Sequence, residues 1–405
     1  MPTMTSCQRV HDALEFKPVD RLPRDLSGMR STGISCFAYP RLVEALGLPP
    51  RRPRIYDTGQ MLALPDLDVL DALGCDCVTV DGMLTNAFEQ PELWHDYDFN
   101  GRLKAKVLDP QSYRVAPDGT IFMGEYHRMG PDSTVFNSEH AGCGIDLSTD
   151  IPPPDVEAYR RGCEEAKLTP EKVKDLAAFY AKVRREAKGR AIFGCEWSSA
   201  TGIGIGMGLY PMQCVLYPED IATQHDLTTQ RCIHNLRLLL PLIKDNVDVL
   251  MMSADDWGTQ TSLVASPDVF RTLFKPYYTR IMHVAHELAP RVKFFLHSCG
   301  AIHPLLGDIA ECGFDIVNPV QWSAGGKTPA EWKAAAGKTL AFWGGGVNAQ
   351  ETLPLKSVEA VRSEVRRVVP ELSKGGGYVF ANTHNILAEI DAQKVVAMYD
   401  EAGKI

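Results

Sequence analysis

Residues 292–320 read VKFFLHSCGAIHPLLGDIAECGFDIVNPV and place a helix-like segment between two apolar stretches. The stretches at 292–297 and 314–320 have the length and composition of buried strands. The segment at 302–311 has the character of a short helix. A strand, a helix and a second strand in this order predict two parallel neighbours in one sheet, joined by a crossover helix.

The same alternation continues along most of the chain. Helix-like segments at 267–288, 302–311, 329–336 and 357–372 follow several of the apolar runs. The predicted strands are 21–26, 76–80, 190–195, 247–253, 292–297, 314–320, 340–343 and 378–382. Eight such strands predict an α/β fold of the (β/α)8 TIM-barrel type. An open doubly wound sheet is the alternative, but no GxGxxG follows the first strand.

A long interval separates the second and third predicted strands. Residues 112–123 have a hairpin pattern with Asp118-Gly119 at the turn, and residues 170–188 are amphipathic. We therefore expect a single domain over residues 1–405, with residues 82–189 inserted near the barrel mouth.

Composition limits the classes of partner. The chain has 405 residues, 45% of them hydrophobic, and a net charge of −9. An acidic protein is a poor match for nucleic acid or an anionic membrane surface. The chain lacks an apolar run of about 18 residues, so no membrane span is predicted. The amino terminus lacks a signal-like apolar stretch, and the 11 cysteines show no disulfide spacing, so we expect a cytoplasmic protein.

Polar residues follow nearly every predicted strand. In a parallel barrel the carboxyl ends of the strands form the active face, so these residues are candidates for chemistry. The alternative is that loops after strands are polar because they are solvated. The residues are Arg30, Asp81, Glu196, Asp255, Asp256, His297, Cys299, Asn318, Gln321, Asn348, Asn382 and His384.

The strongest local signal is the pair His297 and Cys299. Residues two apart in an extended chain point to the same side, and imidazole with thiolate suits zinc. A third ligand could come from His384 or Glu196. By itself, an HxC pair is also compatible with two buried core residues.

Asp255 and Asp256 follow the fourth predicted strand. They could supply a general base or a second carboxylate. Equally, they could cap the helix that follows.

At these positions the chain resembles the uroporphyrinogen decarboxylase superfamily. The resemblance covers nearly the whole chain and is carried by RVHDALEFKPVDRLP (9–23), SADDWGTQ (253–260), HSCG (297–300), NPVQ (318–321), WGGG (343–346) and GGGYVFANTHN (375–385). It implies an α/β barrel.

The superfamily contains two branches that differ in chemistry. In the decarboxylases, which use no metal, basic residues near the amino terminus and an aspartate hold a tetrapyrrole. Arg30 and Asp81 match parts of that pattern, but Ser-Thr-Gly follows Arg30 where the family has Gln-Ala-Gly-Arg.

The second branch consists of zinc-dependent methyltransferases. Its His-x-Cys matches His297 and Cys299, and its later ligand cysteine corresponds to Thr383-His384 in this chain. The resemblance thus implies that His384 substitutes as a nitrogen ligand, or that the site is altered or metal-free. Glu196 matches a family glutamate.

From this resemblance we expect a methyltransferase in a demethylation system. It would use Zn²⁺ to move a methyl group between a small methylated substrate, or a thiol or folate acceptor, and a corrinoid (cobalamin) carried by a partner protein. The expected catalytic residues are Asp255, Asp256, Glu196 and Asp81, with substrate contacts from Arg30, Trp257, Gln260, Asn318, Gln321 and Asn382. Alternatives are a tetrapyrrole lyase and a non-catalytic corrinoid-binding barrel. A symmetric homodimer is also expected.

Overall fold

The computed structural model describes residues 3–81, 85–86, 91–138, 150–196, 198–206 and 208–405. Its central element is a sheet in which the strands follow the order β16-β15-β14-β13-β12-β11-β3-β4. All neighbours are parallel except β4, which pairs antiparallel with β3. The bounds are β3 Cys77–Asp81, β4 Thr85–Asn86, β11 Ala191–Cys195, β12 Val249–Ala254, β13 Lys293–His297, β14 Ile316–Asn318, β15 Ala341–Trp343 and β16 Tyr378–Val379.

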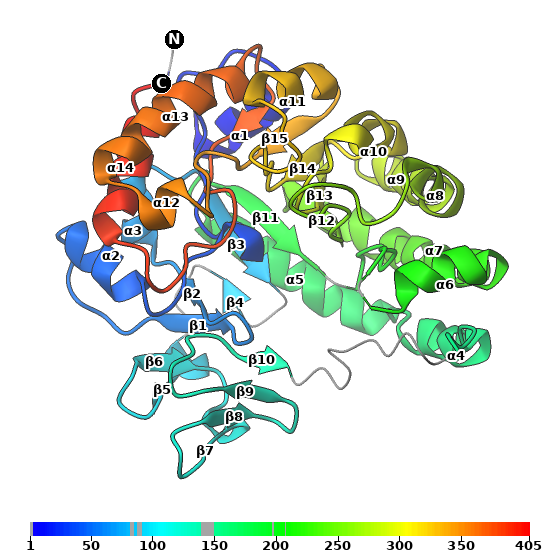
Figure 1. The fold of residues 1–405 in the computed structure, drawn as a ribbon, viewed down its shortest axis with the longest axis horizontal. Helices are drawn as coiled ribbons and strands as arrows, with labels where there is room; N and C mark the ends of the chain where they lie inside the picture. The colour runs from blue at the N-terminus through cyan, green and yellow to red at the C-terminus, as the bar shows by residue number, and fades with distance from the viewer. Residues whose placement is uncertain (1–2, 82–84, 87–90, 139–149, 197, 207) are drawn as a thin grey trace.

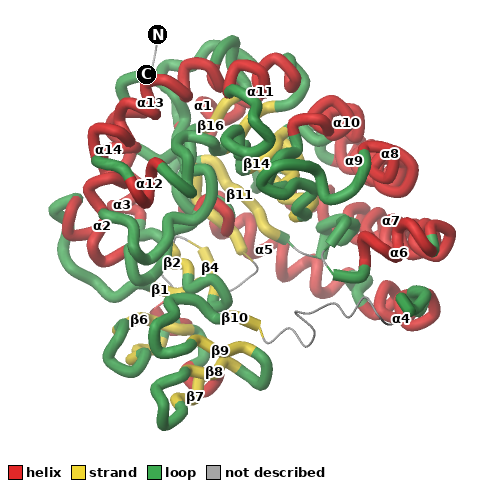
Figure 2. Tube along the Cα trace, in the orientation of Figure 1, coloured by secondary structure: helices red, strands yellow, loops and turns green. Residues whose placement is uncertain are grey.

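Helices surround this sheet and connect its strands (Figures 1 and 2). The connecting helices are α5 Pro170–Glu186, α7 Pro218–Ile243, α9 Lys275–Leu288, α10 Leu306–Cys312, α11 Pro329–Ala336 and α13 Val358–Ser373, while α3 Leu67–Leu73 precedes β3 and α14 Ala392–Ala402 follows β16. The other helices are α1 Ser6–Leu14, α2 Tyr39–Ala45, α4 Val156–Glu165, α6 Tyr210–Leu216, α8 Pro267–Val269 and α12 Thr352–Leu355. Short helical turns cover Arg30–Thr32, Pro91–Leu93, Pro110–Ser112, Phe270–Phe274 and His303–Leu305.

The parallel sheet is strongly curved, and aromatic residues fill its concave side. Phe193 of β11 lies 4.8 Å from Phe295 of β13 and 5.5 Å from Trp343 of β15, measured between ring centroids. In a flat sheet, β11 and β15 would be roughly 19 Å apart, because four strand spacings separate them. The rings therefore meet only because the sheet curls around them.

Both faces of the strands are buried. Residues such as Cys77, Val249 and Val379 join the rings in an inner cluster, while alternate residues such as Val78 and Leu250 pack outward in the layer shared with the helices. This explains why the strands read as continuous apolar runs in the sequence.

The first strand expected from the sequence, 21–26, is not a regular strand. Arg24 makes a single parallel bridge with Phe380, and its carbonyl accepts the N–H of Asp76. Pro23 has no N–H to give, and the N–H of Arg24 goes to the side chain of Asp76 rather than to a strand carbonyl. The segment nevertheless lies between the β16 and β3 sides of the sheet and joins them by hydrogen bonds.

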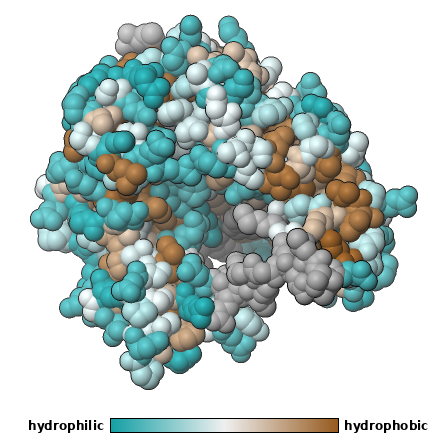
Figure 3. Space-filling model, viewed as in Figure 1, coloured by the Kyte–Doolittle hydropathy of each residue, from teal (hydrophilic) through white to brown (hydrophobic). Residues whose placement is uncertain are grey.

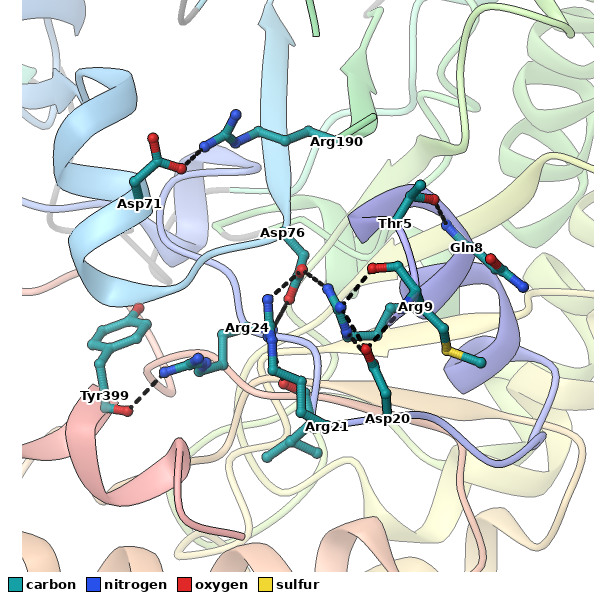
Figure 4. Close-up of polar contacts among 12 residues, drawn as sticks. Thr5, Gln8, Arg9, Asp20, Arg21, Arg24, Asp71, Asp76, Arg190 and Tyr399 are labelled. Atoms are coloured by element: carbon teal, nitrogen blue, oxygen red, sulfur yellow. Dashed lines mark hydrogen bonds and ion pairs between the residues drawn. The ribbon is translucent and has the colours of Figure 1, made fainter. Parts of the chain in front are cut away.

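A buried ion network anchors this junction (Figure 4). Asp76 is fully buried and accepts hydrogen bonds from Arg9 Nη1 at 2.5 Å and from both Nη atoms of Arg21 at 2.8 Å. Arg9 also pairs with Asp20 at 2.6 Å. The network ties α1 and the 20–24 segment to the start of β3.

Two small antiparallel-rich sheets lie beside this body. One has the order β2-β1-β6-β5, with bounds β1 Arg54–Asp57, β2 Leu62–Leu64, β5 His95–Asp98 and β6 Lys104–Val107. The other has the order β10-β9-β8-β7, with bounds β7 Tyr113–Val115, β8 Ile121–Met123, β9 His127–Met129 and β10 Asn137–Ser138. The hairpin expected at 112–123 is formed by β7 and β8.

The first small sheet combines residues from both sides of β3. β1 and β2 precede β3 in sequence, whereas β5 and β6 lie within residues 82–189. Parts of that expected insertion (82–84, 87–90 and 139–149) lie outside the described residues. In the described part of the chain, no helix combines the length and apolarity that a membrane span requires.

The Asp76 network gives a stability prediction. Asp76→Ala would remove one of the two carboxylates that hold the guanidinium of Arg9, which is 4% exposed, and would leave only Asp20. Breaking a buried pair in this way costs about 3–5 kcal/mol of unfolding free energy. Chemical denaturation followed by circular dichroism measures the change. Asp71→Ala is the control, because Asp71 pairs with Arg190 but is largely exposed, and this change should cost less than about 1 kcal/mol. Equal effects of the two changes would contradict the role given to Asp76.

Candidate metal centre

A cavity of about 400 Å³ opens at the carboxyl ends of the parallel strands. The face drawn in Figure 3 is hollowed between the helical body and the two small sheets. The cavity is lined by Met29, Arg30, Ser31, Asp57, Gln60, Cys195, Gly206, Met251, Ala254, Asp255, Asp256, His297 and His384. Most of these residues lie at the ends of strands or in the loops that follow, where the barrel rule predicts chemistry.

His297 is held in one tautomer by its neighbours. Its Nδ1 lies 2.6 Å from Oδ1 of Asn318, which is fully buried at the end of the adjacent strand β14. The amide nitrogen of Asn318 donates to the carbonyl of Trp343 at 2.8 Å, so its oxygen faces the imidazole. His297 must therefore donate from Nδ1, which leaves the lone pair on Nε2.

Cys299 and His384 lie next to that lone pair. Cys299 Sγ is 3.4 Å from His297 Nε2, and a nitrogen of His384 completes a group whose ligand atoms all lie within 4.8 Å of one another. The side chain of Asp256 holds Cys299 in place, because the backbone N–H of Cys299 donates to Asp256 Oδ1 at 2.8 Å. Gly300 follows with φ 84°, and the backbone of Gly258 occupies the space that a Cβ would need.

Both histidines are neutral at pH 7. Burial lowers the pKa of His297 and lowers that of His384 to about 4, where the neighbouring His297 adds to the effect. Burial, together with the charge of Asp256, raises the pKa of the Cys299 thiol. Neutral imidazoles are the form that binds a metal, whereas the thiol has to lose its proton on binding.

The three side chains fit a zinc ion by donor type. Two nitrogens and a sulfur match the N/S preference of zinc, and three protein ligands leave a position for a substrate atom. His297 is preset for this role by Asn318. His384 Nδ1 accepts the N–H of Asn385 at 2.8 Å, which places the ring proton on Nε2. Ligation through Nε2 would move that proton to Nδ1 and break the contact with Asn385.

Asp255 is the buried acid of the site. Its carboxylate accepts the N–H of Ile205 at 2.5 Å and that of Gly206 at 3.2 Å. Burial, with a contribution from the charge of Asp256, raises its pKa to about 6. Neither aspartate caps the following helix, because Ser266 caps α8. Asp255 can therefore hold or release a proton near neutral pH.

Arg30 and Asp57 form a second polar group in the cavity wall, and Asp81, which is not among the residues that line the cavity, pairs with Arg30. Arg30 Nε donates to Asp81 at 2.6 Å and its Nη1 donates to Asp57 at 3.0 Å. Burial raises the pKa of Asp81, although the charge of Arg30 opposes the shift. Sequence reasoning missed Asp57. Its position at the end of the short strand β1 could have suggested it, but that strand lies outside the parallel repeat.

Several expected residues do not line this cavity. Glu196 lies outside the His297 group, and its Oε1 accepts the hydroxyl of Ser198 at 2.8 Å, so the structure does not bring it in as a ligand. Trp257 is fully buried and packs edge-to-face on Phe270 and Phe274, so it cannot touch a substrate there.

The expected amide residues support the loops instead. Gln321 accepts the N–H of Gly300 at 2.9 Å and donates to Gln260 at 3.1 Å, which braces the loop carrying Cys299. Asn382 is fully buried and donates to the carbonyl of His384. Asn318 acts on His297 as described. These residues are placed to orient the candidate ligands.

Comparisons with known proteins agree with the geometry. The sequence profile of the uroporphyrinogen decarboxylase (URO-D) family matches residues 133–405. The chain belongs to this family.

Two known proteins show further similarity to the chain. A uroporphyrinogen decarboxylase from Thioalkalivibrio sulfidiphilus is 28% identical over 233 residues, which cover 55% of this chain and 62% of that relative. A solved methyltransferase from Methanosarcina mazei has a TM-score of 0.56 and 15% identity, with 99% of each chain covered. At that identity the second match establishes the fold alone.

The tautomer of His297 can be tested through Asn318. We expect Asn318→Ala to weaken zinc binding about 10- to 100-fold, because the imidazole loses the partner that orients it. Competition with a chromophoric chelator measures the affinity. Gln350→Ala is the control, since Gln350 lies on the loop after β15 and its side chain makes a long contact of 3.4 Å with Gln321. Unchanged zinc affinity in Asn318→Ala would contradict the assignment.

The raised pKa of Asp255 predicts how stability depends on pH. The folded protein holds this proton up to about pH 6, whereas the unfolded chain loses it near pH 4. Unfolding free energy should therefore fall by about 3 kcal/mol in total as pH rises from well below 4 to well above 6, and Asp255→Asn should lack this component. Carbon-13 NMR of metal-free protein should show the Asp255 carboxyl titrating near 6. Asp25, whose pKa burial also raises to about 6, should keep its titration in the variant.

Proposed function

We propose that this URO-D family protein is a zinc-dependent methyltransferase. It would move a methyl group between a corrinoid protein and a small methylated substrate, or a thiol or folate acceptor, as part of a demethylation system. The observation that carries the proposal is the lone pair of His297 Nε2, which lies 3.4 Å from Cys299 Sγ with His384 beside them, and both histidines line the cavity. In this proposal the chain has the arrangement of a (β/α)8 barrel, in which the single bridge between Arg24 and Phe380 takes the place of the first strand.

Each residue has a distinct part in this scheme. His297, Cys299 and His384 would hold the ion, which supplies Lewis-acid activation of a thiol or of the atom that carries the methyl group. Asp255 would take or give the proton, because its pKa is about 6. Asp256 keeps Cys299 in position through the backbone N–H. Asp81 and Asp57 hold Arg30 at the cavity wall, where it can contact a substrate.

The charge of the cavity supports methyl transfer over tetrapyrrole decarboxylation. Among the described residues that line it, Arg30 is the cation and Asp57, Asp255 and Asp256 are the acids. A tetrapyrrole rich in carboxylates would meet an excess of like charge there. Small methylated substrates without several negative charges meet no such penalty.

The experiment combines metal analysis with methyl-transfer assays. Protein purified without chelators should contain zinc and should transfer methyl groups from at least one methylated donor to Co(I) corrinoid. His297→Ala and Cys299→Ser should each lower the rate at least 100-fold and release the zinc from this site. Cys163→Ser is the control, because Cys163 is a buried thiol of α4 outside the cluster.

Three outcomes would contradict the proposal. Activity retained in both ligand variants would remove the metal from the reaction. Consumption of uroporphyrinogen by metal-free protein would favour the lyase. Tight corrinoid binding without turnover on any donor would favour a non-catalytic binding barrel.

A further inference from the structure

A second cluster of ligand-type side chains lies at the opposite end of the strands. Cys7 and His11 are one turn apart on α1 and so share a face of that helix. Asp248 immediately precedes β12, whose other end leads to Asp255 in the cavity. The length of β12 separates the two clusters by roughly 20 Å. Nothing in the proposed methyl transfer uses this second cluster.

Asp248 divides its two oxygens between two tasks. Oδ2 accepts hydrogen bonds from Arg184 of α5 and from the N–H of Ile192, both at 2.6 Å. Oδ1 faces Cys7 Sγ at 3.2 Å and His11 Nε2 at 2.9 Å. Burial opposes ionisation, but the bond with His11 and the charge of Arg184 lower the pKa of Asp248 to about 2. A charged oxygen therefore faces a thiol and an imidazole.

We propose that Cys7, His11 and Asp248 form a second divalent-cation site of the zinc class. Their ligand atoms all lie within 4.8 Å of one another. Sulfur, nitrogen and carboxylate oxygen together suit zinc or cobalt rather than magnesium or calcium, which prefer oxygen alone. Cys7 and His11 are both partly exposed, so an ion can reach them and water can complete its coordination.

Binding has a simple proton balance. The ion displaces the thiol proton of Cys7, which leaves to solvent, and His11 binds through Nε2 with its proton on Nδ1. The thiolate and the carboxylate oppose the two charges of the ion, and the carboxylate also keeps its contact with the guanidinium of Arg184. Without an ion, burial and Asp248 raise the pKa of Cys7 to about 12, so the thiol stays protonated and donates to the carboxylate.

The site would fasten the amino-terminal helix to the sheet. α1 contributes two ligands, while Asp248 links to α5 through Arg184 and to β11 through the N–H of Ile192. Because the ion binds the folded chain, it raises stability in proportion to its occupancy. We assign the site a structural role, because its ligands join α1 to the start of β12, at the end of that strand opposite Asp255.

The test counts zinc on the full-length protein by inductively coupled plasma mass spectrometry. The Cys7→Ser and His11→Gln variants should each bind one equivalent of zinc less than the unchanged protein. Neither variant should alter the zinc content of the site at His297. The His297→Ala/Cys299→Ser double variant should retain the equivalent bound at Cys7. Cys163→Ser is again the matched thiol control and should lose none. This design separates the second site from the proposed active site, because each is removed by different variants.

A second measurement leaves the cluster intact. Cobalt added to the His297→Ala/Cys299→Ser variant should give a thiolate-to-cobalt band in the near ultraviolet, and adding Cys7→Ser should abolish it. A chelator should lower the melting temperature of the double variant and have no effect once Cys7 is also replaced. Absence of the cobalt band in the double variant, or zinc content that Cys7→Ser and His11→Gln leave unchanged, would overturn the proposal.

Discussion

The curvature of the parallel sheet is the constraint on which the candidate site depends. Phe193, Phe295 and Trp343 come from alternate strands and meet at centroid distances of 4.8–5.9 Å. Their packing draws the carboxyl ends of the same strands around one cavity. His297 and His384 follow strands that are not neighbours in the sheet, yet their rings lie 5.7 Å apart. Without the inner aromatic layer, the candidate ligands would be spread along an edge.

The same layer reaches the site through a chain of hydrogen bonds. Trp343 fills the inner core, its carbonyl accepts the amide of Asn318, and Asn318 sets the tautomer of His297. The indole of Trp343 also donates to Asp25, which holds Gly28 and Thr32 at the two ends of the loop that carries Arg30. One buried residue thus connects the packing of the curved sheet to both polar groups of the cavity.

The sequence was most informative where local pattern and topology agree. Apolar runs ending in a polar residue located the parallel strands β3 and β11 to β16, and the HSCG segment located His297 and Cys299, because parallel strands end on one edge of a sheet. It was less informative where a tertiary contact decides the role. Trp257 follows a strand but is buried by Phe270 and Phe274. Glu196 follows β11 but is held by Ser198. Asp57 belongs to a sheet that the strand–helix alternation does not describe.

The charges in the cavity bear on which ligand the His297, Cys299 and His384 cluster can bind. Asp57, Asp255 and Asp256 face the cavity with Arg30 as their counter-charge, while burial keeps the His297 and His384 rings neutral. Burial raises the pKa of Asp255, and the nearby charge of Asp256 raises it further. On the proposed assignment, a dication bound by the two neutral imidazoles and the Cys299 thiolate would offset this excess of negative charge, whereas a substrate with many carboxylates would increase it. The acids that would disfavour a tetrapyrrole acid are therefore the same ones that would favour a divalent metal.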